Sequence, residues 1–225
     1  MRKKIYSRYR RMGWVLVFIL VLFPATLWLA DRLWPLPLAE VQVARVVVGE
    51  DGTPLWRFAD ADGVWRYPVM LNQVSPYYLQ ALLTFEDRWF YSHPGVNPLA
   101  LARAAWQDLR AGKILSGGST LSMQVARLID PHPRTIAGKL RQVWRTFQLE
   151  WHFSKERILE IYLNRAPFGG TLQGIGAASW TYLGKPPSQL TAAEAALLAA
   201  LPQAPSRLRP DRYPLRAKAA RDKVL

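Results

Sequence analysis

The sequence predicts a mainly α-helical domain with a small β element, preceded by one N-terminal transmembrane helix. Three patterns support this fold class. Residues 14–30 form a charge-free apolar run, apolar residues follow helical spacing from Ser75 onward, and alternation around a turn signal is confined to 44–58. With 225 residues, half of them apolar, the chain is long enough to bury one sizeable core beside a membrane segment.

The composition is strongly basic and lacks cysteine. Thirty Lys and Arg face sixteen Asp and Glu, which gives a net charge of +14, and the surplus persists beyond the basic segment 1–13. Such a surplus favours anionic partners, which include nucleic acid, anionic lipid head groups and phosphorylated substrates, so charge by itself does not select among them. The lack of cysteine excludes disulfides, thiolate nucleophiles and zinc–thiolate sites.

The N-terminal apolar run predicts a signal anchor. Its seventeen residues, 14–30, lie at the short end of the range that a transmembrane helix needs, and Pro24 is expected to kink it. The basic tail 1–13 is expected to be cytoplasmic, with everything after it exported and 31–44 serving as a linker. A cleaved signal peptide is the alternative, but Trp28 stands where a small residue should precede the cleavage site.

The first segments after the linker are predicted as a hairpin and a helix. Alternation on both sides of Asp51-Gly52 predicts a β-hairpin over 44–58. A helix is predicted from Ser75 to a stop at Pro94-Gly95. Its apolar face would consist of Tyr78, Leu82, Phe85 and Trp89.

Helical patterns continue to the end of the chain. Further helices are predicted at 98–111, 120–130, 136–152, 154–164 and 191–201. The last of these begins with a capping box formed by Thr191 and Glu194. In helix 136–152, the stripe expected to face the core consists of Ile136, Leu140, Val143 and Phe147.

The first candidate for chemistry is Glu86, which precedes Asp87 in the closing turns of the first helix after the hairpin. The macrodipole is negative there and disfavours carboxylates, so this placement needs a reason other than helix stability. The helical neighbours of Glu86 would all be apolar: Leu82, Leu83, Trp89 and Phe90. Such a shell favours the protonated carboxyl and suits it to general acid–base work. The alternative is that both carboxylates pair with Arg88 or another arginine.

Glycines and hydroxyls precede the helix predicted at 120–130. The run from Ser116 to Thr120 reads Ser-Gly-Gly-Ser-Thr, and free backbone N–H groups at such a helix start can receive an anion. Arg127 lies on the same face as Gln124, one turn further along, so a phosphate could be held there. An ordinary Ser/Thr N-cap after a loop is the alternative. The sequence lacks the Gly-Lys-Thr/Ser ending of a nucleotide P-loop, which disfavours ATP or GTP chemistry.

Basic residues accumulate around helix 136–152, where Lys139 and Gln142 share one face. They are Arg134, Lys139, Arg141 and Arg145. A solvated basic face is the alternative to a binding role, and the spacing alone does not decide between them.

Taken in order, these stretches and a fourth one resemble the family 51 glycosyltransferases, the peptidoglycan polymerase domain of class A penicillin-binding proteins and of monofunctional transglycosylases. Glu86 to Gly95 completes the family's first motif, Glu-Asp-x-x-Phe-x-x-His-x-Gly. Gly117 to Gln124 matches the second, Gly-Gly-Ser-Thr-x-x-x-Gln. Lys155 to Asn164 matches the fourth, Lys-x-x-Ile-Leu-Glu-x-Tyr-x-Asn. The resemblance covers nearly everything after Leu33.

One departure concerns the third motif, Arg-Lys-x-x-Glu. Its second glutamate is replaced by Gln142 in this chain. An amide cannot act as an acid or carry charge, so a role in protonating a leaving group is excluded, while hydrogen bonding remains open. A diphosphate leaving group departs as an anion when cations stabilise it, and it needs no acid.

The resemblance implies a lysozyme-like glycosyltransferase domain over 45–225 that polymerises lipid II with inversion and releases polyprenyl diphosphate. Glu86 would be the base that takes the proton of the acceptor 4-hydroxyl. The residues that match substrate-binding positions are Asp87, Ser119, Gln124, Arg127, Arg134, Lys139, Gln142, Lys155 and Asn164. Neither a metal site nor a required cofactor is expected, although a divalent cation could accompany the diphosphate.

The expected partners are lipid II, the growing glycan strand, cytoplasmic membrane lipid and other cell-wall synthesis proteins, but not nucleic acid. The expected location is the cytoplasmic (inner) membrane, crossed once, with the N-terminus inside and the catalytic domain periplasmic or extracellular. A transpeptidase domain is not expected within this chain, which has no Ser-x-x-Lys motif. Two alternatives remain: a lysozyme-like glycan hydrolase, and a non-catalytic lipid II-binding scaffold in which Gln142 marks lost activity.

Overall fold

The computed structural model describes residues 14, 18–38, 44–50, 54–98, 102–103, 106–107, 110, 118–133 and 135–225. Contacts between Cα atoms divide the chain into two units, residues 1–38 and 39–225, and each is described by itself. The helix predicted at 98–111 lies largely outside the described residues. Arg134, one of the predicted substrate-binding residues, lies outside them as well.

The first unit contains a short π-helical turn η1, Phe18–Leu22, followed by helix α2, Phe23–Leu33. Pro24 is the second residue of α2, where its missing N–H leaves no hydrogen bond unmade within that helix. Among the described residues, no helix combines the length and the apolarity needed to cross a membrane.

The second unit contains two small sheets. The predicted hairpin is confirmed: β1, Val46–Val48, pairs antiparallel with β2, Pro54–Arg57. A second sheet, which was not predicted, has the order β3-β5-β4, with β3 parallel to β5 and β4 antiparallel to it. Its strands, Trp65–Arg66, Leu172–Gln173 and Pro167–Gly169, are too short to produce an alternation signal.

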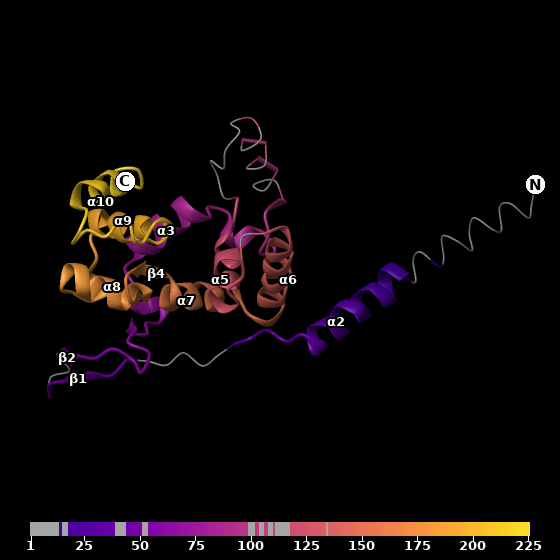
Figure 1. Cartoon of the computed structure of the whole chain (residues 1–225), viewed down its shortest axis with the longest axis horizontal. Helices are drawn as coiled ribbons and strands as arrows, with labels where there is room; N and C mark the ends of the chain where they lie inside the picture. Colours follow the sequence, from indigo (N-terminus) through magenta and orange to yellow (C-terminus); the bar gives the residue numbers. More distant parts are fainter. Residues whose placement is uncertain are drawn as a thin grey trace, which may run out of the picture. The chain divides into compact units, whose positions relative to one another are not determined.

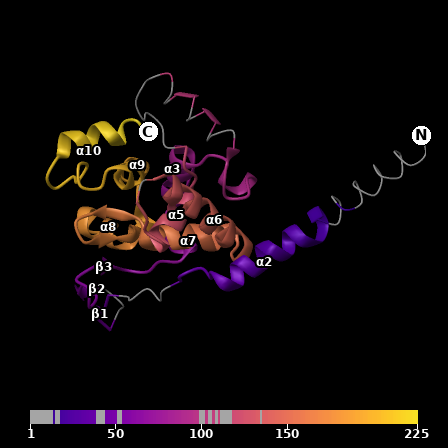
Figure 2. The same cartoon turned by 45° about the vertical axis from the view of Figure 1, so that its right-hand side comes forward.

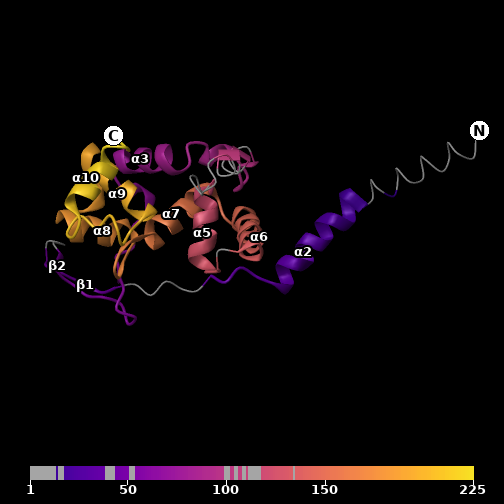
Figure 3. The ribbon, with the colours of Figure 1, turned by 45° about the horizontal axis from the view of Figure 1, so that its top comes forward.

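Helices make up most of the second unit, so the mainly α fold with a small β element is confirmed (Figures 1 and 2). The α-helices are α3 Pro76–Glu86, α5 Leu121–Ile129, α6 Ile136–His152, α7 Lys155–Arg165, α8 Gly174–Leu183, α9 Ala192–Ala200 and α10 Pro214–Arg221. The 3₁₀ turns are η2 Leu71–Gln73, η3 Phe90–Ser92, η4 Pro187–Gln189 and η5 Leu201–Gln203. Helices α8 to α10 gather at one end of this unit and α5 and α6 at the other, with α7 between them (Figures 1 and 3).

The N-caps read from the sequence are confirmed. Thr120 accepts from the Met123 N–H at the start of α5. Ser154, which the sequence analysis did not single out, caps α7 in the same way by accepting from the Arg157 N–H. The capping box at α9 is complete, because the Glu194 carboxylate accepts from the Thr191 N–H at 2.9 Å. Such caps satisfy N–H groups that have no partner inside the helix.

The predicted end of the first long helix was wrong. Helix α3 ends at Glu86 instead of continuing to Pro94-Gly95, and Trp89 is 61% exposed. Asp87 leaves the helical conformation, with φ −160°, because its carboxylate accepts the Leu121 N–H at 2.9 Å. A tertiary hydrogen bond thus ends the helix where the apolar period alone would have continued it.

The predicted core face of α6 was also wrong. Ile136 and Leu140 are 84% and 67% exposed, and Phe147 is exposed as well. The buried face of α6 is mainly polar instead: it includes Gln142, Arg145, Thr146 and Gln148, beside the apolar Leu149. It can be buried because its polar groups find partners: Arg145 Nε donates to Asp130 at 2.8 Å, and its Nη1 donates to Gln148 at 2.7 Å.

The apolar core lies where α3, α7, α8 and α9 meet. Its fully buried side chains include Tyr78, Leu82, Leu159, Tyr162, Ile175 and Leu198. Helix α9 packs against both α3 and α10, while α7 packs against α5 and α8. This packing fixes the C-terminal end of α3, and with it the backbone position of Glu86.

Candidate active site

Two glutamines hold the carboxylate of Glu86, one on each oxygen. Gln124 Nε2 on α5 donates to Glu86 Oε2 at 2.7 Å, and Gln203 Nε2 at the end of η5 donates to Glu86 Oε1 at 2.9 Å. Gln124 is among the predicted site residues. Gln203, which lies 117 positions away in the sequence, was not among the predicted site residues. Glu86 itself is half-buried, so solvent or a ligand can reach it.

The neighbouring carboxylate, Asp87, is buried and committed to the protein. It accepts from His93 Nε2 at 2.9 Å and from the Leu121 N–H at the start of α5, also at 2.9 Å. A carboxylate at a helix N-terminus is stabilised by the macrodipole. The structure therefore places Asp87 beneath the site as a brace between the first motif and α5. The alternative interpretation was that both carboxylates pair with arginines. Among the described residues, neither Glu86 nor Asp87 makes such a pair.

The start of α5 is largely occupied by protein groups. Thr120 Oγ1 donates to the Gly95 carbonyl and also accepts the Met123 N–H, while Asp87 takes the Leu121 N–H. Gly118, with φ 49°, provides the left-handed turn that leads into this cap. The ordinary N-cap anticipated as the alternative thus describes these N–H groups better than an open anion cradle does.

A second polar cluster lies between α5 and α6. Lys139 Nζ donates to Ser119 Oγ and to Gln142 Oε1, both at 3.1 Å, so the structure brings three predicted site residues together. Burial lowers the pKa of the Lys139 ammonium, and the nearby positive charge of Arg127 lowers it further. Two cations held this close, with one partly desolvated, form an environment that an anion would stabilise.

Gln142 uses both ends of its amide. Its Nε2 donates to the Met123 carbonyl at 2.6 Å, and its Oε1 accepts from Lys139. The side chain is buried. An ionised glutamate could accept from Lys139, but it could not donate to the Met123 carbonyl. The geometry at this position therefore suits an amide.

Lys155 and Asn164 make contacts away from Glu86. Lys155 Nζ pairs with Glu150 Oε1 at 2.8 Å, donates to the His93 carbonyl at 2.7 Å and lies 4.6 Å from the centroid of the Phe90 ring. Asn164 accepts the Val69 N–H at 2.8 Å and donates back to the Val69 carbonyl at 2.9 Å. Both side chains therefore tie segments of the domain together: Lys155 joins α7 to the segment with Phe90 and His93, and Asn164 joins α7 to Val69.

Helix α5 connects the two clusters, because Gln124 contacts Glu86 and the positive charge of Arg127, one turn later, acts on Lys139.

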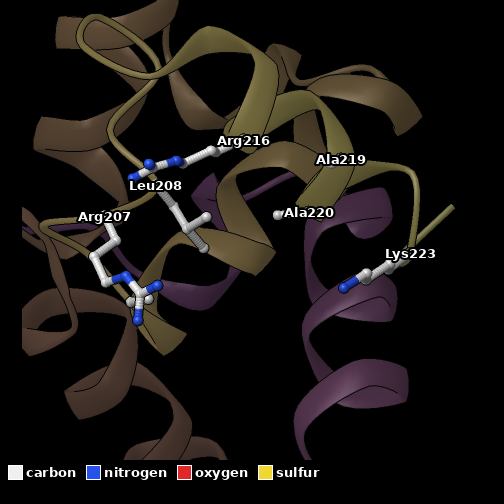
Figure 4. Close-up of a pocket in the computed structure, with 7 residues that line it drawn as sticks. Arg207, Leu208, Arg216, Ala219, Ala220 and Lys223 are labelled. Carbon is white, nitrogen blue, oxygen red and sulfur yellow. The ribbon is translucent and has the colours of Figure 1, made fainter.

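A hollow of about 250 Å³ lies between the segment after η5 and α10 (Figure 4). Its lining residues are Ala204, Arg207, Leu208, Arg216, Ala219, Ala220 and Lys223. Within the described ranges, no group of three or more His, Cys, Asp or Glu side chains is placed to hold a metal ion.

Comparisons with known proteins agree with the motifs. Residues 51–225 match the family described as Transglycosylase. Penicillin-binding protein 1C of Escherichia coli (strain K12) is 73% identical over 88% of this chain and 26% of its own length. Penicillin-binding protein 1F of Bacillus subtilis (strain 168) is 38% identical over 71% of this chain and 22% of its own length. The chain thus spans about a quarter of the length of these relatives.

A solved structure is also similar, the crystal structure of penicillin-binding protein 1A from Haemophilus influenzae. It has 23% sequence identity and a TM-score of 0.43, and the match covers 83% of this chain and 18% of that one.

Proposed function

The chain belongs to the transglycosylase family, and on that premise we propose that it is a peptidoglycan glycosyltransferase, which polymerises lipid II into glycan strands and releases polyprenyl diphosphate. The observation that carries this proposal is the half-buried Glu86 carboxylate, held by two neutral amides and joined through α5 to a cationic cluster. A base beside cations is the arrangement that transfer from a diphosphate donor requires.

Glu86 serves as the general base in this proposal. It takes the proton of the acceptor 4-hydroxyl while that oxygen attacks the anomeric carbon of the growing chain and inverts it. Each carboxylate oxygen accepts one amide N–H and keeps a further lone pair, so a lone pair remains to accept the proton of the acceptor hydroxyl.

Lys139 and Arg127 stabilise the departing diphosphate. An anion placed beside them would reverse the effects that now lower the pKa of Lys139, and binding would thereby favour its charged form. Ser119 and Arg134 belong to the same donor site by motif position. Because cations stabilise the leaving group, no acid is needed at Gln142, and no metal ion is required, although a divalent cation bound with the diphosphate is compatible with the site.

Residues 14–30 serve as a single-pass anchor in the cytoplasmic membrane, with tail 1–13 inside and domain 45–225 on the outer face. The support for this arrangement is the charge-free apolar run behind a basic tail. Phe23, Trp28 and Leu29 of the described part of this segment are exposed, as residues facing lipid would be. Lipid II, the growing strand and membrane lipid are then the immediate partners, with other cell-wall synthesis proteins beside them.

Labelled lipid-linked disaccharide-peptide tests the proposal. We expect the detergent-solubilised chain to produce a ladder of polymers on a gel, and Glu86→Gln to produce none. Binding of the lipid without polymer would support the scaffold alternative and overturn the enzymatic proposal. Cleavage of preformed glycan without polymerisation would instead support the hydrolase alternative.

A further inference from the structure

We propose that Gln203 is a positioning residue for the catalytic base, and this inference rests on the proposed function. Its amide donates to Glu86 Oε1 at 2.9 Å, opposite the donation of Gln124 to Oε2 at 2.7 Å. The two donors come from different parts of the domain, since Gln124 lies on α5 and Gln203 ends η5, the turn that follows α9. Together they define the plane of the carboxylate.

The backbone of Gln203 is well fixed although its side chain is exposed. Helix α9 packs along α3, the helix that ends at Glu86. Leu201, at the start of η5, is fully buried, and the Ala204 N–H donates back to the Leu201 carbonyl at 3.2 Å. Gln203 is therefore held beside Glu86 by the same packing that positions α3.

Glu86 needs this support because of its location. It is the last residue of α3, where the macrodipole repels a negative charge. A glutamate also has several rotatable side-chain bonds, and ordering them costs conformational entropy. A donor on each oxygen opposes both effects, whereas one donor would still let the carboxylate swing about a single contact.

The groups behind Glu86 provide no comparable support. Burial, and in addition the charge of Glu86, raise the pKa of the Tyr78 phenol on α3 and the Tyr162 phenol on α7 well above the ordinary value, so both remain neutral. Their buried hydroxyls have no hydrogen-bond partner among the described residues. The contacts to the carboxylate oxygens from α5 and η5 are the two amides, with Arg127 the next cation along α5.

Substitutions of the exposed Gln203 to Met, Glu and Lys can separate a positioning role from a role in folding. Gln203→Met keeps the length but removes the donor, and we expect kcat to fall about tenfold with KM nearly unchanged, because the base is misplaced in the bound complex. Gln189→Met is the matched control, since Gln189 is likewise exposed and ends a 3₁₀ turn, η4, away from Glu86. The control should retain the wild-type kcat.

The pH profile provides a readout that a structural role would not change. Gln203→Glu places a negative charge beside Glu86, which then binds its proton at a higher pH, so the acid limb of kcat should move up by roughly 0.5–1 pH unit. Gln203→Lys places a positive charge there and should move the same limb down by a similar amount. Identical acid limbs in all three variants, together with an unchanged kcat in Gln203→Met, would overturn the proposal.

A measurement without substrate distinguishes failure here from failure of the proposed function. The carboxyl ¹³C signal of Glu86, assigned by its loss in Glu86→Gln, can be titrated in the wild type and in the Gln203 variants. Shifts of opposite sign in Gln203→Glu and Gln203→Lys would support the contact even if no polymer forms. Polymerisation by the wild type with a titration insensitive to residue 203 would leave the function standing and reject the positioning role.

Discussion

The site around Glu86 and the buried interface between α5 and α6 both use polar side chains, but to different ends. At Glu86, neutral amides surround a charge and leave it reachable. At the interface, Asp130 receives Arg141 at 2.6 Å and Arg145 at 2.8 Å, so opposite charges satisfy one another. In this domain, the carboxylate held by neutral amides, Glu86, lies where we propose the chemistry occurs. The carboxylate paired with arginines, Asp130, instead stabilises the fold.

The largest effect should come from Glu86→Gln. We expect polymerisation to fall about 1000-fold, because the base is lost, while the free energy of unfolding changes by less than about 0.5 kcal/mol. Single-turnover assays and chemical denaturation measure the two quantities. Retained activity would show that Glu86 is not the base, and the proposed contrast between the two regions would then fail.

The converse effect is expected for Asp130→Ala. Removal of the carboxylate takes away the anion that contacts the buried Arg145, which is only 3% exposed, and we expect a loss of about 3 kcal/mol in the free energy of unfolding. Urea denaturation measures it. Arg157→Ala is the control, because the exposed Arg157–Glu160 pair should contribute no more than about 0.5 kcal/mol.

The same carboxylate gives the interface a pH dependence. Hydrogen bonds from Arg141, and then from Arg145, hold the pKa of Asp130 below its ordinary value. A carboxyl group whose folded pKa is depressed contributes stability that is complete above about pH 4 and is lost as the pH falls through the folded pKa. Denaturation curves from pH 7 downward should show this loss in the wild type, and a smaller loss in Asp130→Asn.

A smaller effect is expected at Gln142, which lies where the two regions meet. Gln142→Ala should weaken polymerisation severalfold without abolishing it, because Lys139 loses one of its two hydrogen-bond acceptors. Gln142→Glu should cost about 1–2 kcal/mol of stability, since a carboxylate cannot donate to the Met123 carbonyl. Higher activity together with unchanged stability in Gln142→Glu would show that the structure does not require an amide at this position.

Local sequence signals predicted local structure well. The hairpin at 44–58 and the caps Thr120 and Thr191 follow from interactions within a few residues, and all are confirmed. The family motifs identified Glu86 and its partner Gln124 and brought Ser119, Lys139 and Gln142 into one cluster.

The errors share a cause, which is that long-range polar contacts overrode local periodicity. The bond between Asp87 and the Leu121 N–H ended α3 early. The pairing of Asp130 with Arg145 turned the polar face of α6 inward and its apolar stripe outward. Gln203 was missed for the same reason, since its role depends on α9 packing against α3, which no spacing in the sequence records.

Gly95 shows that the letters of a sequence motif do not all have the same meaning. Its φ of 81° is one that L-residues rarely adopt, and a Cβ there would stand 2.5 Å from Glu150 Cγ and 2.8 Å from Thr146 Cγ2. Alanine at this position would therefore be destabilising for two reasons: its backbone would be strained, and its Cβ would clash with these two side chains. In Glu86-Asp87-x-x-Phe90-x-x-His93-x-Gly95, the first residue is the proposed base, whereas the last is required by the shape of the backbone and its surroundings.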